Sequence, residues 1–220
     1  MAESYVIGVD FGSDSVRALI VNTETGENVG QGVACYPRWK AGLYQHPEYS
    51  IFRQHPLDYL ESLEKCITTA LAELTEEQKD HVIGIGVDTT GSTPVPVDKN
   101  GIPLALLDEF AENENAMFFL WKDHAAAAEA DEINKLFRNN SENDYTKYQG
   151  DYSAEWYWAK ILYAVRHDEA IRQAAYTWEE HCDWMTGILC GETRPEKIYH
   201  SACAAGHKAL WHSEWNGLPA

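Results

Sequence analysis

A short turn near the amino terminus combines a carboxylate, two hydroxyl groups and a guanidinium around one glycine, in Asp10, Gly12, Ser13, Ser15 and Arg17. A glycine at a tight turn lets backbone N–H groups approach an anion closely, and serine and arginine side chains add donors suited to phosphate oxygens. A carboxylate at the end of a strand is placed to hold a hydrated Mg2+, which prefers oxygen ligands. The pattern indicates a hairpin that binds phosphate and metal. The alternative is an ordinary polar turn in which Asp10 pairs with Arg17.

Apolar runs on both sides of this turn predict the strands that position it. We expect strands over residues 6–11 and 16–21 and a third over 29–36. Short turns between consecutive strands imply antiparallel pairing. The composition of residues 38–54 then changes to Tyr, Trp, His and Pro, which indicates an ordered loop.

A long helix is predicted next. Pro56 suits the first helical position, and residues 82–87 beyond the helix read as another strand. Three strands followed by helix, strand and helix predict an α/β domain with a mixed sheet. The helix is indicated by leucine and isoleucine side chains at spacings of three and four, at Leu57, Leu60, Leu63, Ile67, Leu71 and Leu74.

The rest of the chain is expected to be mostly helical. A turn signal at residues 98–101 separates strands expected over 95–97 and 102–107. An alanine-rich stretch over 116–137 predicts a long helix, and Gly191 is a plausible helix stop. Two more helical faces are expected, at Trp156, Ala159, Leu162 and Val165 and at Trp178, Cys182, Met185 and Leu189.

Composition excludes several classes of protein. The formal charge of −18 argues against nucleic-acid or anionic-membrane partners, because proteins bind such partners through basic surfaces. Five cysteines without a CxxC pair, and a start without a signal peptide, predict a cytoplasmic protein without a disulfide framework. No apolar run is long enough to span a bilayer. His181-Cys182-Asp183 and the pair His207 and His212 lack zinc-type spacing, so we reject a zinc site.

Seven segments in a fixed order resemble the FGGY carbohydrate kinases, which belong to the superfamily of actin, hexokinase and heat-shock ATPases. The resemblance covers essentially the whole chain and implies a ribonuclease H-like or actin-like ATPase domain with a mixed sheet and flanking helices. Such a domain is the first of two in this family. The segments are residues 8–17, 36–39, 84–94, 110–113, 120–124, 153–156 and 205–212.

The resemblance implies roles for the residues of the first turn. Asp10 matches the family's magnesium-associated aspartate, and Gly12 and Ser13 match the turn that touches the β- and γ-phosphates. Arg17 matches an arginine near the transferred phosphoryl group. Many relatives carry Thr-Thr or Thr-Ser after the glycine, whereas this chain has Ser13-Asp14, so Asp14 is left without a role.

A second set of residues is implied to line the substrate. Gly91 and Ser92 match the segment at the sugar end, and Lys208 matches a lysine that donates to ketose hydroxyls. A surface lysine extending past Trp211 is the alternative for Lys208. Trp121 either stacks on the sugar or packs in the core of a helical segment. Asp123 either accepts a bond from a sugar hydroxyl or is a solvated helix charge.

The implied activity is phosphorylation of L-ribulose to L-ribulose 5-phosphate by ATP and Mg2+, in L-arabinose breakdown. A kinase for xylulose or ribitol, or a non-catalytic sugar- or nucleotide-binding module, remains the alternative. The family's catalytic base and its ATP-binding domain lie in segments that this chain does not match. We therefore expect residues 1–220 to be the amino-terminal, sugar-binding domain of a longer kinase, without a catalytic residue of its own and inactive alone. The implied partners are small molecules, and homo-oligomer formation is left open.

Overall fold

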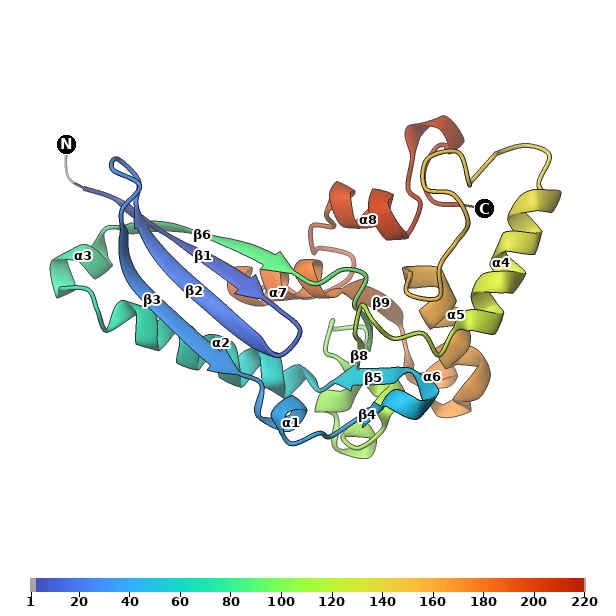
Figure 1. The fold of residues 1–220 in the computed structure, drawn as a ribbon, viewed down its shortest axis with the longest axis horizontal. Helices are drawn as coiled ribbons and strands as arrows, with labels where there is room; N and C mark the ends of the chain where they lie inside the picture. Colours follow the sequence, from blue (N-terminus) through green and yellow to red (C-terminus); the bar gives the residue numbers. More distant parts are fainter. Residues whose placement is uncertain (1–2, 220) are drawn as a thin grey trace. The chain divides into compact units, whose positions relative to one another are not determined.

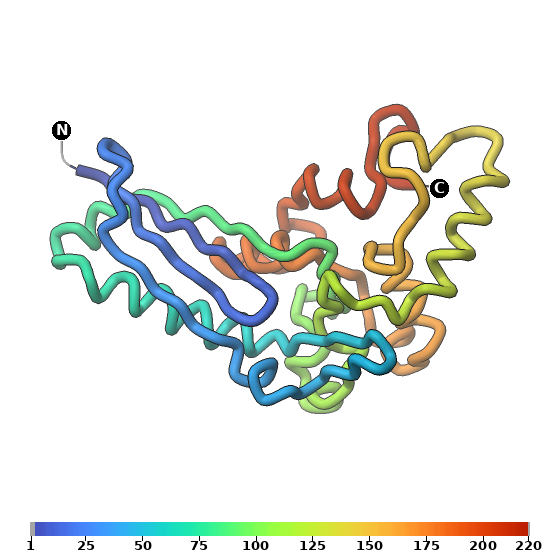
Figure 2. Tube along the Cα trace, viewed as in Figure 1, coloured from blue at the N-terminus to red at the C-terminus, as the bar shows by residue number. Residues whose placement is uncertain are grey.

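The computed structural model describes residues 3–219, which form two compact units. Among the described residues, the first unit contains 3–43 together with 55–90, and the second contains 44–54 together with 91–219. Figures 1 and 2 trace the chain through both units, and each unit is described here by itself.

The first unit is built on a four-stranded sheet in the order β3-β2-β1-β6. Strands β1, β2 and β3 pair antiparallel, and β6 runs parallel to β1, so the predicted mixed sheet is confirmed. Its elements are β1 (Tyr5–Phe11), β2 (Ser15–Asn22), β3 (Asn28–Cys35), α1 (Pro37–Lys40), α2 (Pro56–Leu71), α3 (Glu76–Asp80) and β6 (Val82–Thr89).

Helix α2 covers one face of this sheet, across β2 and β3 (Figure 1). Glycines on β3 allow a close approach, since a Cβ at Gly32 would lie 2.1 Å from the carbonyl oxygen of Cys66 on α2. At Gly30 it would lie 2.6 Å from the carbonyl oxygen of Ala70. The opposite face of the sheet is exposed, and alternate residues such as Asp10 and Arg17 project from it.

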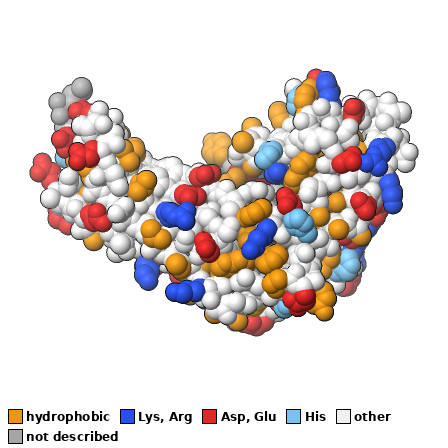
Figure 3. Space-filling view, viewed as in Figure 1, with side chains coloured by type: hydrophobic (Ala, Val, Ile, Leu, Met, Phe, Trp, Pro, Cys, Tyr) orange, Lys and Arg blue, Asp and Glu red, His pale blue; other side chains and the backbone are white. Residues whose placement is uncertain are grey.

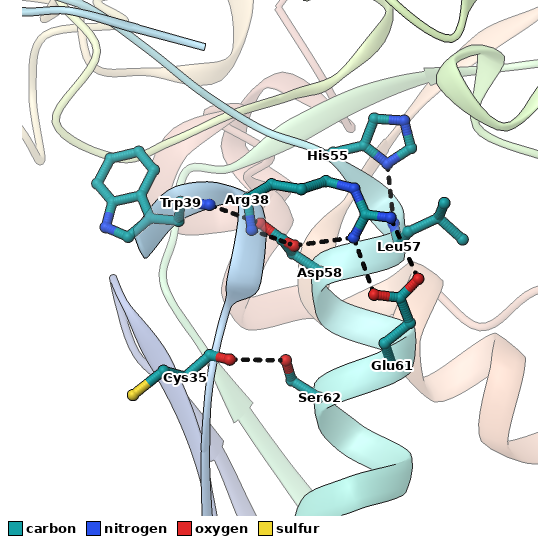
Figure 4. A network of polar contacts seen from close by, with 8 residues as sticks. All are labelled: Cys35, Arg38, Trp39, His55, Leu57, Asp58, Glu61 and Ser62. Carbon is teal, nitrogen blue, oxygen red and sulfur yellow. Dashed lines mark hydrogen bonds and ion pairs between the residues drawn. The ribbon is translucent and has the colours of Figure 1, made fainter. Parts of the chain in front are cut away.

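A polar network ties the end of β3 to the start of α2 (Figure 4). The buried Asp58 carboxylate accepts hydrogen bonds from the backbone N–H groups of Arg38 and Trp39 at 3.1 and 3.0 Å. The Arg38 guanidinium pairs with Asp58 and with Glu61. His55 caps the helix by accepting from the N–H of Leu57. The sequence segment around Arg38 therefore serves to join two elements of the first unit.

The second unit is mostly helical and contains two small sheets. The sheets have the strand orders β4-β5-β8 and β7-β9, and the side chains of Phe118 and Phe119 are fully buried. Its elements are β4 (Gln45–His46), β5 (Ile51–Gln54), β7 (Pro94–Val97), β8 (Phe118–Phe119), α4 (Ala127–Asn139), α5 (Tyr157–His167), α6 (Glu169–Ala174), β9 (Thr177–Glu180), α7 (His181–Cys190) and α8 (Ala202–Lys208).

Two sequence expectations for this unit are wrong. The long helix expected over residues 116–137 begins only at Ala127, because Phe118 and Phe119 pair with β5 instead. The strand expected over residues 102–107 is absent, and a 3-10 turn over Leu104–Leu106 replaces it. Pairing with β7 is limited to one antiparallel bridge between Val97 and Pro103, and Pro103 has no backbone N–H with which to extend a ladder.

Smaller differences concern segment boundaries. Residues 38–54 contain two short strands and helix α1 rather than a loop alone. Trp178 was expected on a helical face but lies in β9, which pairs with β7. Helix α7 ends at Cys190, and the predicted stop Gly191 follows it with a left-handed φ of 72°. No helix within residues 3–219 has the length and apolar character that a bilayer crossing demands.

Candidate functional site

Asp10 and Arg17 face each other across the first hairpin. They are cross-strand partners in the β1–β2 register, and the Arg17 guanidinium lies 3.3 Å from the Asp10 carboxylate. The ion pair that was the alternative interpretation therefore forms. However, the side chains are 55% and 53% exposed, so the pair is open to solvent rather than buried.

Asp88 extends this arrangement onto the neighbouring strand. In the parallel register of β1 and β6 it lies beside Asp10. Asp10, Arg17 and Asp88 all line a groove of about 960 Å³ on the exposed face of the sheet. Sequence reasoning did not select Asp88. The available signal was its position near the end of an apolar strand, as for Asp10.

The hairpin turn is held by its own backbone. The N–H of Gly12 donates to the carbonyl oxygen of Ser15 at 2.9 Å, and the Tyr36 hydroxyl donates to the carbonyl oxygen of Gly12 at 3.1 Å. Burial raises the pKa of Tyr36 well above its usual value, so its hydroxyl stays a donor. The Asp14 carbonyl accepts from the N–H of Tyr36, and Ser13 is half-buried beside it.

The two residues predicted to lie at the sugar end, Gly91 and Ser92, differ in their exposure to solvent. Gly91 is exposed, and a Cβ there would meet nothing within 4 Å. Ser92 is only 1% exposed, and its hydroxyl donates to the Glu180 carboxylate at 2.8 Å. The N–H of Thr93 donates to the same carboxylate at 2.9 Å. The Ser92 hydroxyl is therefore occupied inside the protein.

Trp121 and Asp123 follow the short strand β8, and neither lies in a helix. Trp121 is 39% exposed, whereas Leu120 before it is fully buried. Asp123 is fully buried and forms an ion pair with Arg53 and accepts a bond from the N–H of Phe52 at 2.7 Å. The solvated helix charge expected for Asp123 is therefore wrong, and its carboxylate is occupied by Arg53 and by the N–H of Phe52.

Lys208 is the last residue of α8 and is half-buried. Its ammonium lies 4.8 Å from the centre of the Trp156 ring, which is a cation–π distance. Burial lowers the pKa of Lys208, while the charges of Glu155 and Glu180 oppose that shift. Within residues 3–219, no carboxylate lies within ion-pair distance of its ammonium.

Lys160 was missed by sequence reasoning and is a fully buried charged group beside these segments. It lies in the first turn of α5 and is 0% exposed. Its ammonium donates to the carbonyl oxygens of Ser92 and Leu120 at 2.6 and 2.9 Å. Burial lowers the pKa of Lys160 and raises that of Glu180, while each charge opposes the shift of the other. A lone lysine in an apolar helical face was the available signal.

Comparison with known proteins places the chain in a family. A sequence model described as the FGGY family of carbohydrate kinases, N-terminal domain, matches residues 5–203. The chain belongs to the FGGY family of carbohydrate kinases. The family resemblance stated from the sequence is thereby confirmed.

Curated FGGY relatives carry a common name. The chain is 53% identical over 218 residues to the ribulokinase of Vibrio parahaemolyticus, covering 99% of this chain and 38% of that protein. It is 35% identical over 222 residues to the ribulokinase of Shouchella clausii, covering 98% of this chain and 38% of that protein. The chain therefore spans well under half the length of these relatives.

Solved FGGY kinase structures share the fold. The xylulose kinase from Bifidobacterium adolescentis matches with a TM-score of 0.74 at 18% identity, covering 99% of this chain and 42% of that one. The Plasmodium falciparum glycerol kinase with ADP matches with a TM-score of 0.73 at 15% identity, covering 99% of this chain and 40% of that one. These matches confirm the predicted actin-like fold of a sugar kinase.

Proposed function

We propose that a protein containing this chain transfers the γ-phosphoryl group of ATP to the terminal hydroxyl of L-ribulose, as a step in L-arabinose breakdown. The observation that carries the proposal is the 53% identity to a ribulokinase over 99% of the chain. The activity is proposed for a protein of that relative's length. We expect its nucleotide domain and its catalytic base to lie outside residues 1–220, and these residues alone to be inactive.

The hairpin of the first unit supplies the proposed phosphate contacts. Arg17 is an exposed guanidinium suited to phosphate oxygens, and Gly12 and Ser13 form the turn beside it. Since the N–H of Gly12 already donates to Ser15, we expect the contacts to come from other groups of this turn.

Asp10 is the proposed Mg2+ ligand, with Asp88 beside it. Within residues 3–219, no three His, Cys, Asp or Glu side chains gather into a metal-binding cluster. Magnesium in kinases is held by one or two carboxylates together with waters and substrate phosphates. The exposed carboxylates of Asp10 and Asp88 fit that donor set. When bound, the ion would offset charge on the phosphates.

The proposed sugar contacts lie in the second unit. Gly91 offers exposed backbone and Trp121 offers a partly exposed ring. Lys208 offers an ammonium that lies beside the Trp156 ring and, among residues 3–219, has no carboxylate at ion-pair distance. Ser92 is proposed to shape this wall through its backbone, because its hydroxyl is bonded to Glu180. An indole face and a cationic donor suit a polyhydroxylated ketose.

The proposed chemistry is an in-line transfer. The bond between the γ-phosphorus and the oxygen bridging to the β-phosphate breaks, and the phosphorus bonds to the terminal hydroxyl oxygen of the sugar. The hydroxyl proton passes to a base that we do not assign to any of these residues. Positioning and electrostatic stabilisation carry most of such a reaction.

Product analysis tests this proposal. The full-length protein is incubated with ATP, Mg2+ and L-ribulose, and ADP and sugar phosphate are measured by chromatography and mass spectrometry. We expect one ADP for each ribulose 5-phosphate formed. Phosphorylation of xylulose or ribitol in place of L-ribulose would establish the alternative kinase. Sugar binding without any turnover would establish the binding-module alternative.

A further inference from the structure

We propose that Lys160 is a positioning residue. It fixes the positions, relative to each other, of the two segments of the second unit that are proposed to face the sugar, residues 91–93 and 120–121. This inference rests on the proposed function, because it assigns a purpose to the same wall. Lys160 itself is fully buried and touches no solvent.

The contacts of Lys160 join segments that are far apart in sequence. Its ammonium donates to the carbonyl oxygen of Ser92 at 2.6 Å and to that of Leu120 at 2.9 Å, with Phe119 at 3.4 Å. Three acceptors match the three protons of an ammonium. One buried group on α5 therefore holds both backbone segments.

The residues next to the two bonded carbonyls are the exposed ones. Gly91 precedes Ser92 and is exposed, and Trp121 follows Leu120 and is 39% exposed. Each of these two carbonyls thus belongs to the residue next in the chain to a surface position proposed to meet the sugar. A shift of either segment would change the separation between the Gly91 backbone and the Trp121 ring.

Glu180 binds the segment 91–93 through polar groups that Lys160 does not contact. It accepts from the Ser92 hydroxyl at 2.8 Å and from the Thr93 N–H at 2.9 Å. Ser92 therefore has its carbonyl fixed by a cation and its hydroxyl fixed by an anion. Burying two charges is costly unless both are hydrogen-bonded, and a core needing only packing could use apolar residues here. The arrangement therefore points to a requirement for exact backbone placement.

Kinetics of the full-length enzyme test the proposal. The Lys160→Met variant keeps an unbranched side chain of similar size and removes its donors, so we expect the KM for L-ribulose to rise about tenfold. The KM for ATP should be unchanged. The Lys160→Arg variant keeps a cationic donor with a different reach, so its ribulose KM should fall between those of the wild type and the Met variant.

A matched control separates positioning from general stability. Ile171 is a fully buried apolar residue of the same unit whose side chain makes no hydrogen bond, and Ile171→Ala should lower stability without changing either KM. If the Met variant does not fold, the Arg variant decides, and an unchanged ribulose KM there overturns the inference. Equal rises in the KM for ribulose and for ATP would also overturn it. A wild-type enzyme inactive on L-ribulose would instead refute the proposed function.

Discussion

Asp10 and Asp14 lie on the same hairpin, but only Asp10 lines the groove with Arg17 and Asp88. The exposed Asp10–Arg17 pair contributes at most about 1 kcal/mol to stability. Asp10→Asn should therefore leave the free energy of unfolding nearly unchanged while lowering kcat about 100-fold, through loss of the proposed metal ligand. Steady-state kinetics and urea unfolding measure the two effects. Asp14→Asn is the matched control, and an equal loss of kcat in both variants would refute the assignment.

Lys208 and Lys147 form a second matched pair. Both ammonium groups lie near an aromatic ring, at 4.8 Å from Trp156 and 5.0 Å from Tyr148, but Lys147 also pairs with Glu214. If Lys208 donates to the ketose, Lys208→Met should raise the KM for L-ribulose about 10- to 100-fold. Lys147→Met should leave it unchanged. An unchanged KM for L-ribulose in the Lys208→Met variant would contradict sugar binding by Lys208 and favour the alternative of a surface lysine.

His181 gives the protein a pH-dependent stability. The side chain is fully buried beside Phe118, and burial lowers the pKa of His181 from 6.5 to about 3. The unfolded chain then binds a proton more readily, so this contribution to stability is complete above about pH 6.5 and is lost as the pH falls toward 3. Between about pH 7 and pH 5 the loss should be about 2 kcal/mol.

The His181→Phe variant isolates this effect in urea unfolding. It keeps an aromatic ring at the position and removes the titrating group. Its stability should fall less than that of the wild type over the same pH interval. Parallel pH dependence in the two proteins would show that His181 is not the group responsible.

At the scale of elements, the contact of α2 with the sheet depends on glycine. A Cβ at Gly32 would lie 2.1 Å from a backbone oxygen of α2, whereas a Cβ at Gly8 on the exposed face would meet nothing within 4 Å. Gly32→Ala should therefore destabilise the protein by about 3 kcal/mol or more. Gly8→Ala should be neutral or stabilising by up to about 1 kcal/mol. Urea unfolding compares the two, and equal effects would contradict the packing described.

Elements set by local pattern were predictable, and those set by distant pairing were not. The hairpin at Gly12, helix α2 from Pro56 and strand β6 follow from apolar periodicity and turn residues close in sequence. Strand β8 does not, because Phe118 and Phe119 pair with a strand more than sixty residues earlier. That tertiary pairing keeps Phe118 and Phe119 out of the helix, which forms only from Ala127 onward.

The same distinction explains the candidate site. The Asp10–Arg17 pair is readable because both residues flank one turn. Lys160 contacts Ser92 and Leu120, which are 68 and 40 residues away in the chain. The sequence near Lys160 gives no sign of such a contact, except that a charged residue stands in an apolar helical face. The burial of Asp123 by Arg53 was missed for the same reason.

At the scale of the whole molecule, the charge of −18 repels nucleotide phosphates in general. On the face seen in Figure 3, both acidic and basic side chains are exposed. A phosphate ligand therefore has to be met by local groups, which is the role proposed for Arg17 and a magnesium ion at Asp10. Cytoplasmic location and homo-oligomer formation stay predictions.

The central proposal is that the protein is a kinase with L-ribulose as its preferred acceptor. The most direct test is kcat/KM of the full-length protein for L-ribulose, D-xylulose and ribitol at saturating ATP and Mg2+. We expect the highest kcat/KM for L-ribulose. An equal or higher value for D-xylulose or ribitol would contradict it.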